Sequence, residues 1–156
     1  MTVERSDLRC TLTALLAAWV TMVFGTSLLM AAFGPIGPRP EGVQELARAV
    51  WKGADDMGPV VKLLLIALFG MQVLGGRRLD PERPGPGLAI KAALGALAML
   101  LTVALIPESL SRGFGVALTG ARFDPATLPI YLCGGALGGV VFALSRQKCR
   151  ASRSRG

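Results

Sequence analysis

The sequence predicts an all-α integral membrane protein, a single domain over residues 1–156 with four transmembrane helices and an amphipathic helix on the outer face between the first two. Hydrophobic residues make up 52% and charged residues only 17% of the 156 residues, whereas about a quarter of a soluble domain is charged. Four long apolar runs also lack the two-residue alternation of barrel strands. Backbone polar groups in hydrocarbon must be satisfied within each segment, so we expect these runs to be helices.

The predicted spans follow the four apolar runs directly. The first has no charged residue, and at about 1.5 Å per residue it is long enough to cross a hydrocarbon core of about 30 Å. The second and third each carry a single lysine near their start, and the fourth carries no charge. The spans are expected at residues 12–33, 57–76, 88–106 and 127–145.

The first run also has features of a cleaved signal peptide. Arg5 and Arg9 precede it, and the small residues Ala31 and Ala32 follow. Its apolar stretch is, however, longer than a signal-peptide core of about 7–15 residues, because it continues to Phe33. We therefore expect a retained transmembrane helix.

The distribution of basic residues predicts the orientation in the membrane. Five basic residues fall in the first and third connections, where acidic residues offset them. Under the positive-inside rule, the termini and the middle connection then face the cytoplasm of a bacterial inner membrane. The basic residues expected on that side are Arg5, Arg9, Arg77, Arg78, Arg83, Arg146, Lys148, Arg150, Arg153 and Arg155.

The middle connection, residues 77–87, contains three prolines and two glycines. These residues predict a rigid, non-helical basic turn that makes a hairpin of the second and third helices. Its arginines, Arg77, Arg78 and Arg83, are expected to bind anionic lipid headgroups.

The first connection changes from a proline-rich spacer to an amphipathic segment. The helix predicted over residues 42–55 has one apolar face and one polar face. It would lie along the outer leaflet with Trp51 at the membrane interface. Packing on the outer loops of the protein itself is the alternative. Residues 108–126 are expected to form a compact outer loop. The apolar face of the amphipathic helix consists of Val43, Leu46, Ala47, Val50, Trp51 and Ala54.

Lys62 and Lys91 lie about one turn inside the second and third spans. A charged group inside a membrane raises a functional hypothesis. A lysine stem near a helix end can also carry its ammonium to the headgroups, and Lys62 could pair with Asp55 or Asp56. We expect both lysines to act as interfacial anchors.

Small residues form stripes on the last two spans, and those of the fourth span are glycines. Such stripes permit close approach of helix backbones, which drives association where lipid surrounds the helices. The packing could be within the bundle or against other subunits, including a second copy, and the sequence does not separate these. The predicted packing residues are Gly134, Gly135, Gly138 and Gly139.

Several kinds of chemistry are not expected. The chain has no histidine, which excludes His-based metal sites and Ser–His or Cys–His catalysis. The basic residues flank apolar runs rather than aromatic residues, so nucleic acid is not an expected partner. No cofactor, metal or enzymatic activity is predicted. Two of the cysteines, Cys10 and Cys149, are predicted near the cytoplasmic face and Cys133 in a helix, so we expect no structural disulfide.

A stretch of about 65 residues resembles a known family. The stretch begins with a proline-x-x-lysine-leucine motif at the start of an apolar helix, and a basic loop follows. A helix rich in small residues comes next and ends at a proline, and a Phe-Gly pair lies beyond it. The stretch resembles the small inner-membrane proteins of the IcmC/DotE group in Dot/Icm-type (type IVB) secretion and conjugation systems. The motifs are Met57–Leu64, Gly75-Gly76, Leu105-Ile106-Pro107, Ser109-Leu110-Ser111 and Phe114-Gly115.

The resemblance implies a non-enzymatic component of a secretion or conjugation machine. Conjugative pilins share the design of two small-residue helices joined by a short basic loop, so a pilin-like role is included. Our expectation is a structural subunit that acts by helix packing and contacts lipid and other subunits. The rivals are an accessory subunit of a respiratory or photosynthetic complex and a small transporter or channel with Lys62 in its pathway.

Overall fold

The computed structural model describes residues 2–35, 39–75, 84–106 and 125–153. These residues form helices and no strand, which confirms the all-α prediction. Four of the helices contain segments long and apolar enough to cross a membrane: Leu8–Phe33, Gly58–Gly75, Gly87–Leu105 and Leu128–Cys149. The helices are α1 (Thr2–Phe33), α2 (Val43–Asp56), α3 (Gly58–Gly75), α4 (Pro84–Leu105) and α5 (Leu128–Arg153).

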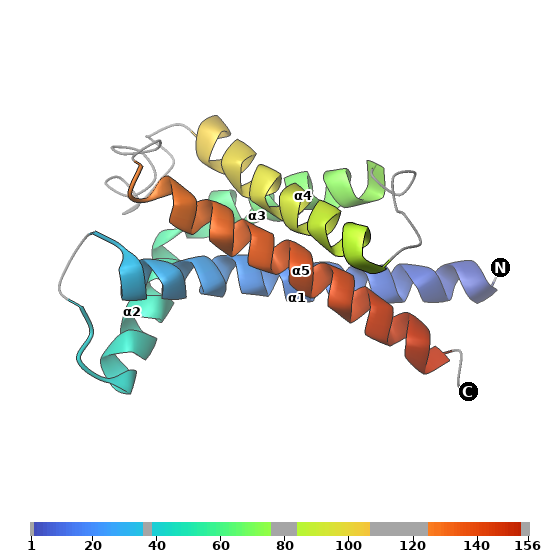
Figure 1. The fold of residues 1–156 in the computed structure, drawn as a ribbon, viewed down its shortest axis with the longest axis horizontal. Coiled ribbons are helices and arrows are strands. Elements are labelled where there is room, and N and C mark those ends of the chain that lie inside the picture. The colour runs from blue at the N-terminus through green and yellow to red at the C-terminus, as the bar shows by residue number, and fades with distance from the viewer. Residues whose placement is uncertain (1, 36–38, 76–83, 107–124, 154–156) are drawn as a thin grey trace.

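The last helix, α5, holds the bundle together. It packs along α1 on one side and α4 on another, whereas α3 packs mainly on α4 and touches α1 only slightly. In Figure 1, α1 and α5 run antiparallel, so both termini lie at one end of the bundle. The amphipathic helix α2 crosses α1 steeply near the opposite end. The chain therefore needs α5 to join α1 to α4.

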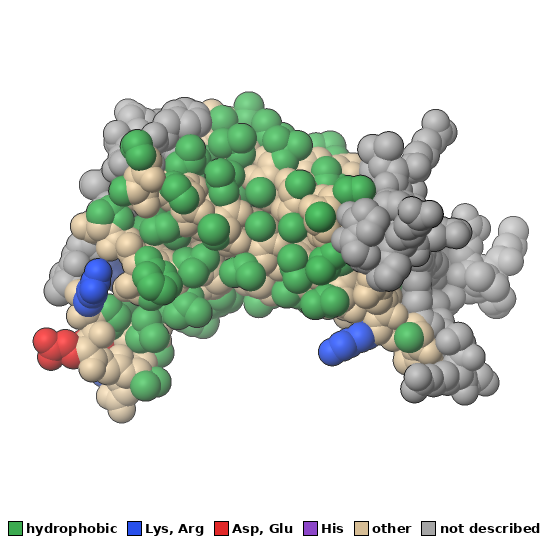
Figure 2. Space-filling view, in the orientation of Figure 1, with side chains coloured by type: hydrophobic (Ala, Val, Ile, Leu, Met, Phe, Trp, Pro, Cys, Tyr) green, Lys and Arg blue, Asp and Glu red, His purple; other side chains and the backbone are tan. Residues whose placement is uncertain are grey.

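The outside of the bundle is apolar, as a membrane protein requires. Figure 2 shows hydrophobic side chains over the middle of the molecule and charged ones towards its two ends. Soluble monomers rarely expose so extensive an apolar surface, so lipid or another protein must cover it. On α1 the exposed residues recur every four positions, and we call this row the lipid-facing stripe: Leu8, Leu12, Leu16, Val20, Phe24 and Leu28.

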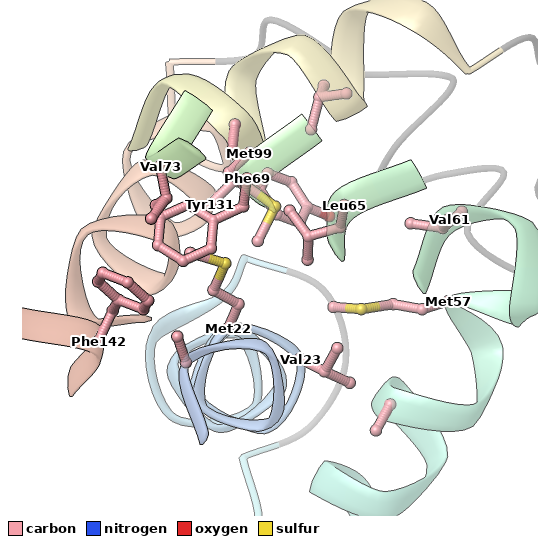
Figure 3. Close-up of a cluster of buried hydrophobic side chains, with 14 of the residues drawn as sticks. Met22, Val23, Met57, Val61, Leu65, Phe69, Val73, Met99, Tyr131 and Phe142 are labelled. Atoms are coloured by element: carbon pink, nitrogen blue, oxygen red, sulfur yellow. The ribbon is translucent and has the colours of Figure 1, made fainter. Parts of the chain in front are cut away.

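The interior is a cluster of apolar side chains drawn from all five helices (Figure 3). The rings of Phe69 on α3 and Phe142 on α5 meet edge to face, with centroids 5.7 Å apart. Tyr131 and Leu65 are fully buried in the same cluster. This core attaches α3 to the rest of the bundle.

The hydroxyl of Tyr131 lies in this core without a hydrogen-bond partner among the described residues. A buried unsatisfied donor costs about 1–3 kcal/mol. We therefore expect Tyr131→Phe to raise the thermal unfolding midpoint in detergent. Tyr131→Ala, which leaves a cavity, should lower stability by about 3–5 kcal/mol. A lower midpoint for the Phe variant would show that the hydroxyl has a stabilising partner.

At the end of the bundle that holds the chain termini, the start of α4 and the end of α5 differ from the predicted spans. The prediction of a non-helical turn up to residue 87 is wrong at its end, because α4 begins at Pro84. Prolines are tolerated in the first turn of a helix, where backbone N–H groups have no partner within the helix. The helix α5 continues to Arg153, so the predicted basic tail is largely helical. Within it, Arg146 is only 8% exposed.

The prediction of an amphipathic helix is confirmed by α2. Its N-terminal part is open, with Val43 85% exposed, whereas Ala54 at its other end is buried. The helix ends at Asp56, Met57 is its C-cap residue, and Gly58 follows with φ +68. This left-handed conformation suits glycine, and Gly58 is also the first residue of α3, with Pro59 in its first turn, so the chain turns sharply from α2 into α3.

The prediction that the chain has no structural disulfide is wrong. Cys10 near the start of α1 is bonded to Cys149 near the end of α5, with their Cα atoms 5.8 Å apart. The two cysteines are 139 positions apart in the sequence. Antiparallel packing of α1 and α5 brings the two cysteines together. The prediction rested only on their expected location near the cytoplasmic face and not on their distance. Cys133 remains a free, exposed thiol.

Candidate functional site

One glycine face of α5 packs against α1. A Cβ atom at Gly134 would lie 3.0 Å from the Cα atom of Thr26, and one at Gly138 would lie 2.9 Å from the carbonyl oxygen of Ala18. Ordinary Cβ contacts are longer than both distances. The missing side chains therefore let the two backbones approach closely.

The other glycine face packs against α4. A Cβ atom at Gly135 would lie 3.0 Å from the carbonyl carbon of Gly95, and one at Gly139 would lie 2.9 Å from the Cα atom of Ala92 and closer still to the carbonyl of Lys91. Both predicted packing faces thus lie within this chain. Packing between subunits, if it occurs, uses other surfaces.

The prediction that Lys91 is an interfacial anchor is wrong, because its side chain is only 4% exposed. The lysine lies on the part of α4 that α5 covers, next to Gly139. The position of Lys91 in the sequence gives its depth in the span, but it does not show on which face of the helix the side chain lies. The predicted headgroup-binding residues Arg77, Arg78 and Arg83 lie outside the described residues.

Lys62 and Trp51 come together at a pocket between α1, α2 and α3. The cavity volume is about 210 Å³. Trp51 on α2 is 69% exposed, which suits the predicted interfacial position. The pocket is lined by Trp19, Val20, Val23, Phe24, Trp51, Ala54, Asp55 and Lys62.

The pocket is held in shape by two contacts of α1. The indole Nε1 of Trp19 donates a hydrogen bond of 2.9 Å to the backbone carbonyl of Lys62. The rings of Phe24 and Trp51 lie 5.9 Å apart at an interplanar angle of 42°. These contacts tie α1 to the start of α3 and to α2, respectively, although α1 and α3 otherwise touch little.

The pocket places two opposite charges in an apolar surrounding. Among the described residues, neither Lys62 nor Asp55 forms an ion pair, so the predicted pairing between Lys62 and Asp55 is not seen. Asp55 is exposed and Lys62 is half-buried. An apolar cavity with a separate cation and anion can bind a molecule that carries both charges, or either one.

Sequence reasoning missed Trp19, Phe24 and Asp55 as members of one site. Trp19 offered a signal, because an indole N–H deep in an apolar helix must find an acceptor. The acceptor is a backbone carbonyl on another helix, and backbone carbonyls carry no sequence signal. The sequence likewise carries no signal for the contact between α1 and α2.

Comparison with known proteins does not extend these observations. No family model matches the chain, and neither a curated protein nor a solved structure matches it. What the structure itself shows is a multi-pass helical membrane protein with a glycine-packed central helix and a charged aromatic pocket.

Proposed function

We propose that the chain is a non-enzymatic structural subunit of a bacterial inner-membrane secretion or conjugation machine. The observation that carries the proposal is the exposed apolar surface of α1 and α3, which a neighbouring subunit can cover. Within the chain, the two glycine faces of α5 join α1 and α4 at backbone-to-backbone distances. Such contacts make a rigid block with little room for a pathway between these helices. This supports a packing role over conduction.

The outer surface supports the same role. The lipid-facing stripe on α1 and the exposed face of α3 present apolar side chains, including Leu63 at 67% and Met71 at 62% exposure. Lipid or a neighbouring subunit can cover such a surface. The resemblance to the IcmC/DotE group, which includes the start of α3, is what narrows the complex to a secretion machine.

The orientation we propose places both termini in the cytoplasm. The bias of basic residues supports this side, because cytoplasmic ends of membrane proteins are enriched in lysine and arginine. A disulfide is more typical of the opposite, oxidising side. The structure bonds Cys10 to Cys149 at this end of the bundle, so the bond and the basic residues point to opposite orientations, and accessibility labelling decides between them.

Accessibility labelling tests this orientation. In a Cys133→Ser background, we expect a membrane-impermeant maleimide to label Gln44→Cys in intact cells. Ser152→Cys, which is also exposed, should be labelled only after the cells are opened. The reverse pattern would overturn the proposed orientation.

Deletion of the gene tests the role. In a host with a Dot/Icm-type system, we expect loss of substrate transfer to recipient cells and unchanged oxygen consumption. The wild-type gene and a Cys133→Ser variant should both restore transfer. Normal transfer with reduced respiration would instead support an accessory subunit of a respiratory complex and contradict the proposal.

A further inference from the structure

We propose that the pocket between α1, α2 and α3 binds the headgroup of a zwitterionic phospholipid, with its phosphate at Lys62 and its ammonium group at Asp55 and the aromatic rings. This binding site is independent of the secretion role. It rests on the charges of the pocket, its lining and its position beside the lipid-facing stripe.

The charge pattern favours a zwitterion over a simple anion. An anionic headgroup would meet Lys62 favourably but would be repelled by the carboxylate of Asp55, which lines the same pocket. An ammonium group attached to the phosphate satisfies both residues. Neither residue is occupied by an ion pair with another described residue, so both charges are available to a ligand.

The aromatic lining supports the same assignment. The pocket contains both tryptophans of the chain together with Phe24. Cations bind over tryptophan faces, with a stabilisation of about 0.5–1 kcal/mol at exposed sites. The rings of Phe24 and Trp51 contact each other, with centroids 5.9 Å apart, so an ammonium group beside this pair can lie within the distance of about 6 Å over which a ring attracts a cation.

The position of the pocket favours a lipid over a ligand dissolved in water. Val20 and Phe24 line the pocket and also belong to the lipid-facing stripe. An acyl chain attached to the bound headgroup would continue along that stripe towards Leu16. The volume of about 210 Å³ is below the roughly 300–1,000 Å³ of pockets that enclose drug-sized molecules. It suits a headgroup whose chains remain in the bilayer.

Tryptophan fluorescence can report this site, because the only two tryptophans of the chain line it. The full-length protein is reconstituted into phosphatidylglycerol vesicles. A fixed fraction of the lipid is then replaced by chain-brominated phosphatidylethanolamine, or by chain-brominated phosphatidylglycerol. Bromine quenches nearby indoles, so the ratio of the two quenching curves measures headgroup preference.

We expect the wild-type protein to bind phosphatidylethanolamine about two- to fivefold more tightly than phosphatidylglycerol, the ratio that a modest cation–π and ionic gain supplies. Asp55→Asn should abolish this preference, and Lys62→Gln should weaken quenching by both lipids. Lys62→Arg should retain the wild-type pattern, since it keeps the cation.

Two matched variants control for general changes of surface charge. Asp56→Asn and Lys52→Gln neutralise charges near the pocket at residues that do not line it, and both should keep the wild-type preference. Equal quenching by the two lipids in the wild type would overturn the proposal. So would a preference that survives Asp55→Asn, because the carboxylate would then not contact the ammonium group.

Discussion

Gly139→Ala is expected to remove most of the folded protein from detergent extracts. A Cβ atom at this position would collide with the carbonyl of Lys91 and lie 2.9 Å from the Cα atom of Ala92. Both obstacles belong to the α4 backbone, which cannot rotate away as the end of a side chain can. Overpacking a core costs about 1–3 kcal/mol, and a backbone collision places this change at or above the upper end.

Gly70→Ala is the matched control for this substitution. Gly70 is also buried in a spanning helix, but its added Cβ would meet only the Leu15 Cδ2 atom at 3.7 Å, an ordinary contact. We expect normal yield and an unchanged or raised unfolding midpoint, because alanine favours helix over glycine. The measurement is the monodisperse fraction in size-exclusion chromatography together with thermal unfolding. Equal behaviour of the two variants would contradict the close contact between α4 and α5.

Loss of the Cys10–Cys149 bond should produce the second large effect. Closing a loop of 139 positions constrains the unfolded chain, and bonds of this kind contribute about 2–4 kcal/mol in proteins. We expect Cys10→Ser to lower the thermal unfolding midpoint of the purified, oxidised protein by several degrees. A reductant should lower the midpoint of the wild type to the same value.

The third cysteine separates the bond from a general effect of reductant. Cys133 is free and exposed, so Cys133→Ser should unfold like the wild type and keep its response to reductant. Cys10→Ser should show no response. A reductant effect that persists in Cys10→Ser would mean that the bond between α1 and α5 is not its source.

The apolar runs predicted the spans because a bilayer imposes a minimum length on any crossing helix. The ends were less predictable, since helices continue into water wherever local contacts hold them. The extension of α5 to Arg153 is one example, because its apolar pattern stops earlier while the Cys10–Cys149 bond lies within it. The start of α4 at Pro84 is a second example, because proline breaks a helix in its interior but not in its first turn.

The sequence could predict which side of a helix is buried only where the opposite side is polar. The three- and four-residue spacing of apolar residues along α2 identified its apolar side, and the structure buries Ala54 on that side. Within a span every side is apolar, so the sequence could not show that Lys91 is covered by α5 or which helix each glycine contacts. The pocket was hidden for the same reason, because it depends on how α1, α2 and α3 meet.

The central place of α5 has a consequence for the timing of biosynthesis. The α5 helix is the last to leave the ribosome, about a hundred residues after α1, which at about 5–20 residues per second is a delay of roughly 5–20 s. During that interval the face of α1 that will pack on α5, including Ala18 and Thr26, has no cover from this chain. A ribosome stalled before residue 128 would thus leave α1 and α4 in the bilayer without the surface that joins them.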